Sequence, residues 1–249
     1  QNVLPWNTAE IERLSATLGA IATKIGPWKL KLPPVILLVK TSGREEAGAA
    51  YCRGAAIVLP QNVLQANEAG LNKILPHELF HVLSSHNPEL REKLYAIIGF
   101  KACNEVQLPD ALRNRKITNP DAPLNNQFIA VDQDGRRMEL MPILISKSPR
   151  YDVARGGTLF NYLDFKLMLL EGSQGMHRPA LAAGQPVLFE PSRVPGFSEQ
   201  VGQNTKYIIH PEEILADNFV FLLNGRINLP SPRVVESMGR ILQAAAEAR

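Results

Sequence analysis

Residues 77–81 read HELFH, which places two histidines four positions apart with a glutamate directly after the first. If this stretch is helical, His77 and His81 share one face of the helix, at a spacing that suits two imidazole nitrogens on one metal ion. Glu78 is rotated by about one hundred degrees from His77, so it can reach a metal-bound water without ligating the metal. Zinc lowers the pKa of such a water to about 7, and a carboxylate can take its proton. The spacing therefore predicts a Zn²⁺ site, and the simpler alternative is an amphipathic helix with two histidines near its surface.

A catalytic zinc usually takes three protein ligands, so a third ligand must lie elsewhere. One family pattern continues H-E-x-x-H-x-x-G-x-x-H, but Ser84 and Asn87 occupy the glycine and third-histidine positions here. His86 is one residue early, so the chain does not follow that pattern. The third ligand is therefore expected further along the chain.

The segment HPEEILADNFVFLLNG, residues 210–225, supplies the best candidate. Glu213 and Asp217 are four positions apart on a short and otherwise apolar helix, where like charges repel if they are exposed. The pair makes sense if Glu213 ligates a cation and Asp217 orients a histidine ring. Glu212 is the alternative third ligand, and acidity favoured by the helix dipole is the simpler explanation for Glu212 and Glu213.

HELFH together with EEILAD resembles the gluzincin group of zinc metallopeptidases, whose pattern is H-E-x-x-H on one helix and E-x-x-x-D on a later one. The resemblance implies His77, His81 and Glu213 as zinc ligands. It also implies Glu78 as general base and acid, and Asp217 as a residue that orients a histidine ligand without binding the zinc itself.

The same resemblance implies a lobe with a mixed sheet whose edge strand pairs with extended substrate. RGAAIVLP, residues 53–60, lies upstream of the motif where such a strand would sit. The long segment 82–212 would be a large insertion or an altered lower lobe.

Peptide hydrolysis builds negative charge on the carbonyl oxygen, and a Tyr, His or Arg donor usually helps to stabilise it. Tyr207, six residues before Glu213, and His177, in the loop-like stretch GMHRP, are the first candidates. Further candidates are Arg178, Tyr151 and Tyr162.

The leading functional hypothesis is a zinc metallopeptidase that hydrolyses an extended peptide or protein substrate, with Glu78 as general base. Two alternatives stay open. One is a peptidase-like binding module that holds zinc without turnover, and the other is a zinc hydrolase of a non-peptide amide or ester.

Local signals place the elements that must position these residues. Asn7 can cap a helix to about Lys24, with Glu10 in the capping-box position. Short strands are expected at 35–39 and 53–59, and helical residues at 62–69 broken by Gly70.

The motif helix is expected from near Asn72 to Ser85, because Pro76 is tolerable only in a first turn. A helix at 89–99 follows. The middle segment, 104–206, is rich in Pro, Gly and Asn, and strands are expected there at 128–132, 137–145, 159–170 and 187–190. Two final helices are expected at 211–224 and 232–248.

These elements predict an α+β fold, with helices and a small mixed sheet, a β-rich and loop-rich middle and C-terminal helices. The resemblance to the gluzincins implies that this fold is zincin-like. The chain is interpreted as a single metallopeptidase unit, 1–249, with approximate lobes 1–103 and 104–249.

The bulk composition excludes some classes of partner. The net charge of +3 is scattered, which argues against nucleic-acid binding, and no apolar run approaches the roughly 20 residues of a membrane span. The chain begins at Gln1, which favours a processed, secreted or periplasmic protein. Cys52 and Cys103 are expected to be two free thiols or one disulfide.

Overall fold

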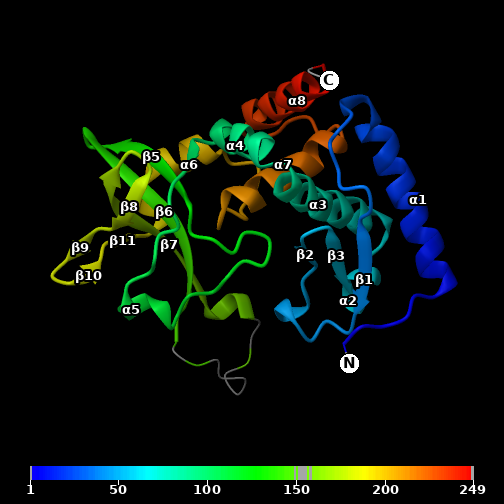
Figure 1. Ribbon diagram of the computed structural model, residues 1–249, viewed down its shortest axis with the longest axis horizontal. Helices are drawn as coiled ribbons and strands as arrows, with labels where there is room; N and C mark the ends of the chain where they lie inside the picture. Colours follow the sequence, from blue (N-terminus) through cyan, green and yellow to red (C-terminus); the bar gives the residue numbers. More distant parts are fainter. Residues whose placement is uncertain (1, 149, 151–155, 157–158, 248–249) are drawn as a thin grey trace. The chain divides into compact units, whose positions relative to one another are not determined.

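The computed structural model describes residues 2–148, 150, 156 and 159–247, and these form an α+β fold (Figure 1). The contacts divide the chain into two units: unit 1 joins residues 1–94 to residues 215–249, and unit 2 comprises residues 95–214. The expected lobes, 1–103 and 104–249, therefore differ from the observed division at the C-terminus. The difference arises because the C-terminal helices pack with the N-terminal residues, which local sequence signals do not reveal.

Unit 1 contains a three-stranded mixed sheet in the order β1-β3-β2, made of β1 (Leu37–Thr41), β2 (Tyr51–Arg53) and β3 (Ala56–Pro60). β1 is parallel to β3, and β2 is antiparallel to it. The expectation that residues 53–60 form an edge strand is wrong, because β3 is paired on both sides. Its continuous apolar run is buried, as is usual for a central strand. The edge strands of this sheet are β1 and β2, and both precede the motif helix in the chain.

Helix α1 (Thr8–Ile25) begins with the predicted capping box. The Asn7 side chain accepts from the Glu10 backbone N–H, and the Glu10 carboxylate accepts from the Asn7 N–H. The Lys40 ammonium lies 2.7 Å from Glu10 Oε1, and it lowers the pKa of that carboxyl below its ordinary value. This ion pair ties the first turn of α1 to β1.

The motif helix, α3 (Glu68–His86), is longer than the sequence predicts and begins after an Asn67 cap. Both Gly70 and Pro76 lie inside it, so the expected start near Asn72 is wrong. Proline has no N–H to donate to the carbonyl four residues earlier. The Asn224 side chain supplies the missing donor, since its Nδ2 donates to the Asn72 carbonyl at 3.3 Å.

Four further helices lie wholly or partly in unit 1. They are α2 (Gln61–Leu64), α4 (Pro88–Ile97), α7 (Pro211–Leu223) and α8 (Pro232–Glu247), with a 3-10 turn, η1 (Gly26–Trp28), after α1. The unit boundaries fall inside α4 and α7, so each of these helices begins in one unit and continues in the other.

Unit 2 is β-rich, as the composition of the middle segment predicts. Its six-stranded antiparallel sheet has the order β11-β7-β6-β5-β4, and β8 pairs with β7. The strands are β4 (Phe100–Ala102), β5 (Gln127–Gln133), β6 (Arg136–Ser146), β7 (Leu163–Ser173), β8 (Met176–Pro179) and β11 (Leu188–Phe189). Shorter elements are α5 (Asp110–Arg113), β9 (Leu181–Ala182), β10 (Gln185–Pro186) and α6 (Pro195–Val201).

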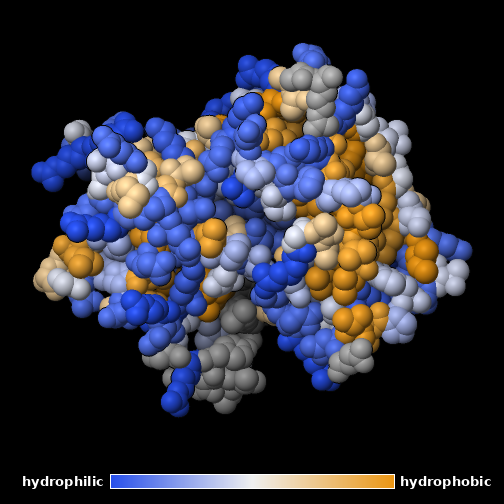
Figure 2. All heavy atoms as spheres, in the orientation of Figure 1, coloured by the Kyte–Doolittle hydropathy of each residue, from blue (hydrophilic) through white to orange (hydrophobic). Residues whose placement is uncertain are grey.

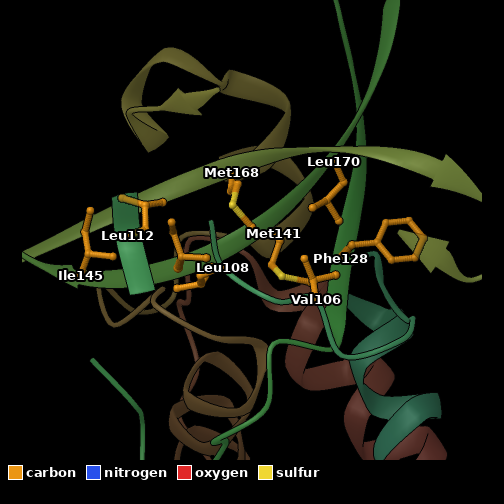
Figure 3. Packing of buried hydrophobic residues seen from close by; sticks show 9 residues of the cluster. Val106, Leu108, Leu112, Phe128, Met141, Ile145, Met168 and Leu170 are labelled. Carbon is orange, nitrogen blue, oxygen red and sulfur yellow. The ribbon is translucent and has the colours of Figure 1, made fainter. Parts of the chain in front are cut away.

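One face of this sheet carries an apolar core (Figure 3). Alternate residues of β6 and β7 point into it, because side chains alternate between the two faces of a strand. The preceding loop and α5 cover the same face. The buried members are Val106, Leu108, Leu112, Phe128, Met141, Ile143, Ile145, Met168 and Leu170.

Hydrophobic side chains are also exposed on unit 1. Figure 2 shows them around β1, where Val35 is 63% and Leu37 is 59% exposed. Among the described residues, the structure contains no helix with the length and apolar character needed to cross a membrane.

Candidate metal centre

Helix α3 presents the three residues of the HELFH motif. The helix is held by apolar side chains on the opposite faces, and Leu75, Phe80 and Leu83 are fully buried. His77 and His81 lie one turn apart with their ring centroids 4.8 Å from each other and their planes at 83°. The predicted helical placement of the two histidines is therefore confirmed.

Helix α7 lies beside α3 in unit 1 and brings Asp217 to the motif. The two helices pack through apolar residues, and the rings of Phe80 and Phe219 are 5.6 Å apart. His77 Nδ1 is 3.1 Å from Asp217 Oδ1, and both side chains are largely buried. Because a carboxylate only accepts hydrogen bonds, this contact favours the His77 tautomer with its proton on Nδ1, in which Nε2 is the ring nitrogen that can ligate a metal.

Glu213 lies one helical turn before Asp217 on the same continuous helix. Residues four apart share a helix face, so the contact of Asp217 with His77 turns Glu213 toward the motif as well. One ligand atom from each of His77, His81 and Glu213 lies within 4.8 Å of the other two. The three residues predicted as zinc ligands therefore form one group.

The carboxylate of Glu213 is buried and has a polar partner besides the histidines. Asn119 Nδ2 donates to Glu213 Oε1 at 2.6 Å. Asn119 follows no helical or strand periodicity with the other site residues, and sequence reasoning did not identify it. It limits the rotation of the Glu213 carboxylate.

Glu212, the alternative third ligand, is engaged elsewhere. Its carboxylate accepts a short hydrogen bond from the Tyr95 hydroxyl, and both residues are buried. Of the two groups of possible ligands found among the described residues, the one with the two histidines contains Glu213, and neither contains Glu212. The two adjacent glutamates thus have different neighbours, Tyr95 for Glu212 and the two histidines for Glu213.

The donor set fits a zinc ion. Two ligands that share a tetrahedral zinc lie roughly 3.4 Å apart, given metal–ligand bonds of about 2.1 Å, so three donor atoms grouped within 4.8 Å need only small movements. Two neutral imidazoles and one carboxylate match a hydrolytic zinc site. Glu78, Glu213 and Asp217 are all buried, and a divalent cation would offset the cost of three carboxylates removed from water.

Glu78 is buried at the side of the motif helix and contacts a thiol. Cys52 Sγ, on β2, is 3.2 Å from the Glu78 carbonyl oxygen and 3.4 Å from Glu78 Oε2. Cys52 and Cys103 are both free thiols. Sequence reasoning considered Cys52 only as a disulfide partner and missed its place beside the glutamate.

His177, predicted as a donor to the oxyanion, lies on β8 in unit 2. Its Nε2 is 2.9 Å from Glu139 Oε2, and its ring is 4.4 Å from that of Phe128. The backbone N–H of His177 donates to Asn104 Oδ1, and Asn104 Nδ2 donates to the His177 carbonyl. These contacts give His177 a structural role in the sheet of unit 2, and its role in catalysis stays a prediction.

The other candidate donors also stay predictions. Tyr207 is 37% exposed, and its backbone N–H donates to Thr205 Oγ1. The Tyr162 hydroxyl donates to the Gly156 carbonyl, and Arg178 pairs with Glu171. Residue 151, a further candidate, lies outside the described residues.

The chain matches no family model, no curated protein and no solved structure. Its function is therefore inferred from the residues of the site itself.

Proposed function

We propose that this chain is a zinc-dependent peptidase with a site of the gluzincin type. One observation carries the proposal: the H-E-x-x-H helix and the E-x-x-x-D helix bring donor atoms of His77, His81 and Glu213 into one group. These are the ligands that the two sequence patterns predict, although the patterns are far apart in the chain.

The proposed roles follow from the chemistry of each side chain. His77, His81 and Glu213 would hold the ion, and Asp217 would keep His77 in the tautomer whose Nε2 binds metal. When bound, zinc supplies a Lewis acid that polarises the scissile carbonyl and acidifies water. Glu78 takes a proton from the attacking water on its carboxylate and delivers it to the leaving amine nitrogen.

The proposed substrate is an extended peptide. β2 is an edge strand of the sheet in unit 1. Backbone groups along such an edge can hydrogen-bond an added strand of substrate. Because β2 also carries Cys52, which contacts Glu78, a peptide paired with this edge would lie near the general base.

The test is cleavage of a quenched fluorescent peptide library by zinc-loaded wild type and by zinc-loaded Glu78→Gln. The wild type is expected to cleave, and the variant to lose about 10²-fold to 10⁴-fold in kcat while it keeps its zinc. His86→Ala is the matched control, because His86 is an exposed histidine of the same helix.

Equal activity in Glu78→Gln would contradict the proposed role of Glu78. If wild type and variant both bind zinc and neither cleaves any peptide, the peptidase proposal fails. The first alternative would then be a module that holds zinc and recognises a partner without turnover.

A further inference from the structure

The buried thiol of Cys52, on the edge strand β2, contacts the motif helix α3. The residue is only 4% exposed, and so is Glu78. Sγ has two oxygen atoms of Glu78 within reach, the backbone carbonyl at 3.2 Å and Oε2 at 3.4 Å. Both residues belong to unit 1, so this contact is internal to it.

A thiol has one proton, so it can donate fully to only one of these oxygens. The carbonyl of a residue inside a helix already accepts from the N–H four residues later, here that of Val82. The carboxylate carries negative charge and is the stronger acceptor. A buried carboxylate also needs donors, because an unsatisfied charged group away from water is costly.

We propose that the Cys52 thiol donates to Glu78 Oε2 and positions the general base. With Oε2 held by β2, Oε1 is the oxygen that takes the proton from water. Cys52 is thus a positioning residue for the reaction, and it couples the strand that would bind substrate to the carboxylate that would act on it. This inference rests on the proposed peptidase function for its catalytic consequence, but not for the hydrogen bond itself.

The size and chemistry of sulfur fit this place. A hydroxyl forms shorter hydrogen bonds than a thiol, so serine at residue 52 would keep a donor but must shift to reach Oε2. Alanine would remove the donor and leave a small cavity beside a buried charge. Alanine at residue 52 therefore tests whether a hydrogen-bond donor is needed, and serine tests whether that donor must be a thiol.

The hydrogen bond is tested without any activity measurement, by infrared spectroscopy of the S–H stretch. A Cys103→Ser background removes the second thiol, so the remaining band belongs to Cys52. The band is expected at a lowered frequency, since a donating S–H bond is weakened. It is expected to move up in Glu78→Gln, whose amide is a weaker acceptor, and further in Glu78→Ala, which removes the side-chain acceptor at residue 78.

An unchanged band in Glu78→Ala would overturn the proposal, because the thiol would then not donate to the Glu78 carboxylate. A band at the frequency of a free thiol in the otherwise unchanged protein would overturn it as well. Neither result depends on finding a peptide substrate, so failure of the hydrogen bond is distinguishable from failure of the proposed function.

The catalytic consequence is tested on a peptide that the wild type cleaves. Cys52→Ala is expected to lower kcat about tenfold with KM within twofold of the wild type and with zinc content unchanged, and Cys52→Ser is expected to restore most of the loss. Cys103→Ala, in unit 2, is the matched control and should leave kcat unchanged. Unaltered kcat in a folded Cys52→Ala variant would overturn the positioning role even if the hydrogen bond exists.

Discussion

Two part-buried histidine–carboxylate pairs among the described residues, one in each unit, differ at the second ring nitrogen of the histidine. In unit 1, His77 Nδ1 contacts Asp217 at 3.1 Å, and one of the histidine's ring nitrogens belongs to a group with His81 and Glu213. In unit 2, His177 Nε2 contacts Glu139 at 2.9 Å, but its buried Nδ1 has no hydrogen-bond partner within the described part of the chain. The surroundings of the remaining ring nitrogen therefore decide whether such a pair belongs to a candidate metal group or to the framework of a sheet.

The largest difference is expected in zinc binding. His81→Ala removes one of the three grouped donors, so bound zinc should fall from one ion per chain to nearly none after dialysis. His177→Ala should keep one ion per chain, because its contacts are with Glu139, Asn104 and Phe128. Zinc content measured by atomic absorption on folded samples decides this. Equal loss of zinc from both variants would abolish the distinction between the two pairs.

Substitution of the two carboxylates should also affect zinc binding differently, but the difference should be smaller than for the histidines. Asp217→Asn can no longer hold the His77 proton as a charged acceptor, so zinc affinity should fall about 10-fold to 100-fold. Glu139→Gln is the matched substitution in unit 2 and should leave the affinity unchanged. Competition with a zinc-binding dye measures both. An unchanged affinity in Asp217→Asn would show that Asp217 has no part in orienting the ligand.

Stability should respond to the pair in unit 2. His177→Ala leaves a cavity against Phe128 and removes the partner of Glu139, so the free energy of unfolding should fall by about 1–3 kcal/mol. Arg178→Ala, an exposed neighbour on the same strand, should change it by less than about 0.5 kcal/mol. Urea unfolding of the zinc-free proteins provides the values. A loss of kcat without a loss of stability in His177→Ala would instead support the predicted role of His177 at the oxyanion.

The smallest expected effect concerns Cys103, whose neighbour is Glu139. Burial, and then the Glu139 carboxylate, raise the pKa of the Cys103 thiol to about 11. In the unfolded chain the thiol ionises at its ordinary pKa of 9.0. The neutral, buried thiol therefore contributes its full stabilisation of the folded state below pH 9.0, and this stabilisation is lost as the pH rises through about 11.

Alkylation of Cys103 by iodoacetamide, followed by peptide mass mapping, measures this pKa in the folded protein. The rate should rise steeply only toward pH 11, and in Glu139→Gln the rise should begin at lower pH. A midpoint near pH 9 in the unmodified protein would contradict the placement of the thiol beside Glu139.

Local chemistry explains what could be predicted from the sequence. The capping box of Asn7 and Glu10 defined the start of α1, and Pro211 marked the start of α7. The spacings of His77 with His81 and of Glu213 with Asp217 each need only one helix to be meaningful. The grouping of His77, His81 and Glu213 was predicted because a zinc ion held by two histidines needs a third ligand, and because the two motifs together resemble the gluzincin pattern.

Long-range contacts explain what could not be predicted. Pro76 is tolerated deep in α3 because Asn224, on a distant part of the chain, donates to the carbonyl that proline leaves without its usual partner. β3 is a central strand because β1 and β2 both pair with it, and no local signal fixes that order. The contacts of Asn119 with Glu213 and of Cys52 with Glu78 depend on tertiary packing in the same way.

The most direct test of the account is an anomalous-difference map at the zinc absorption edge, from crystals of the zinc-loaded protein. We expect one strong peak per chain, bonded to His77 Nε2, the His81 imidazole and the Glu213 carboxylate, with Asp217 still in contact with His77 Nδ1. A zinc ion bound by other residues, or no peak at this group in a protein that carries one zinc per chain, would contradict the account.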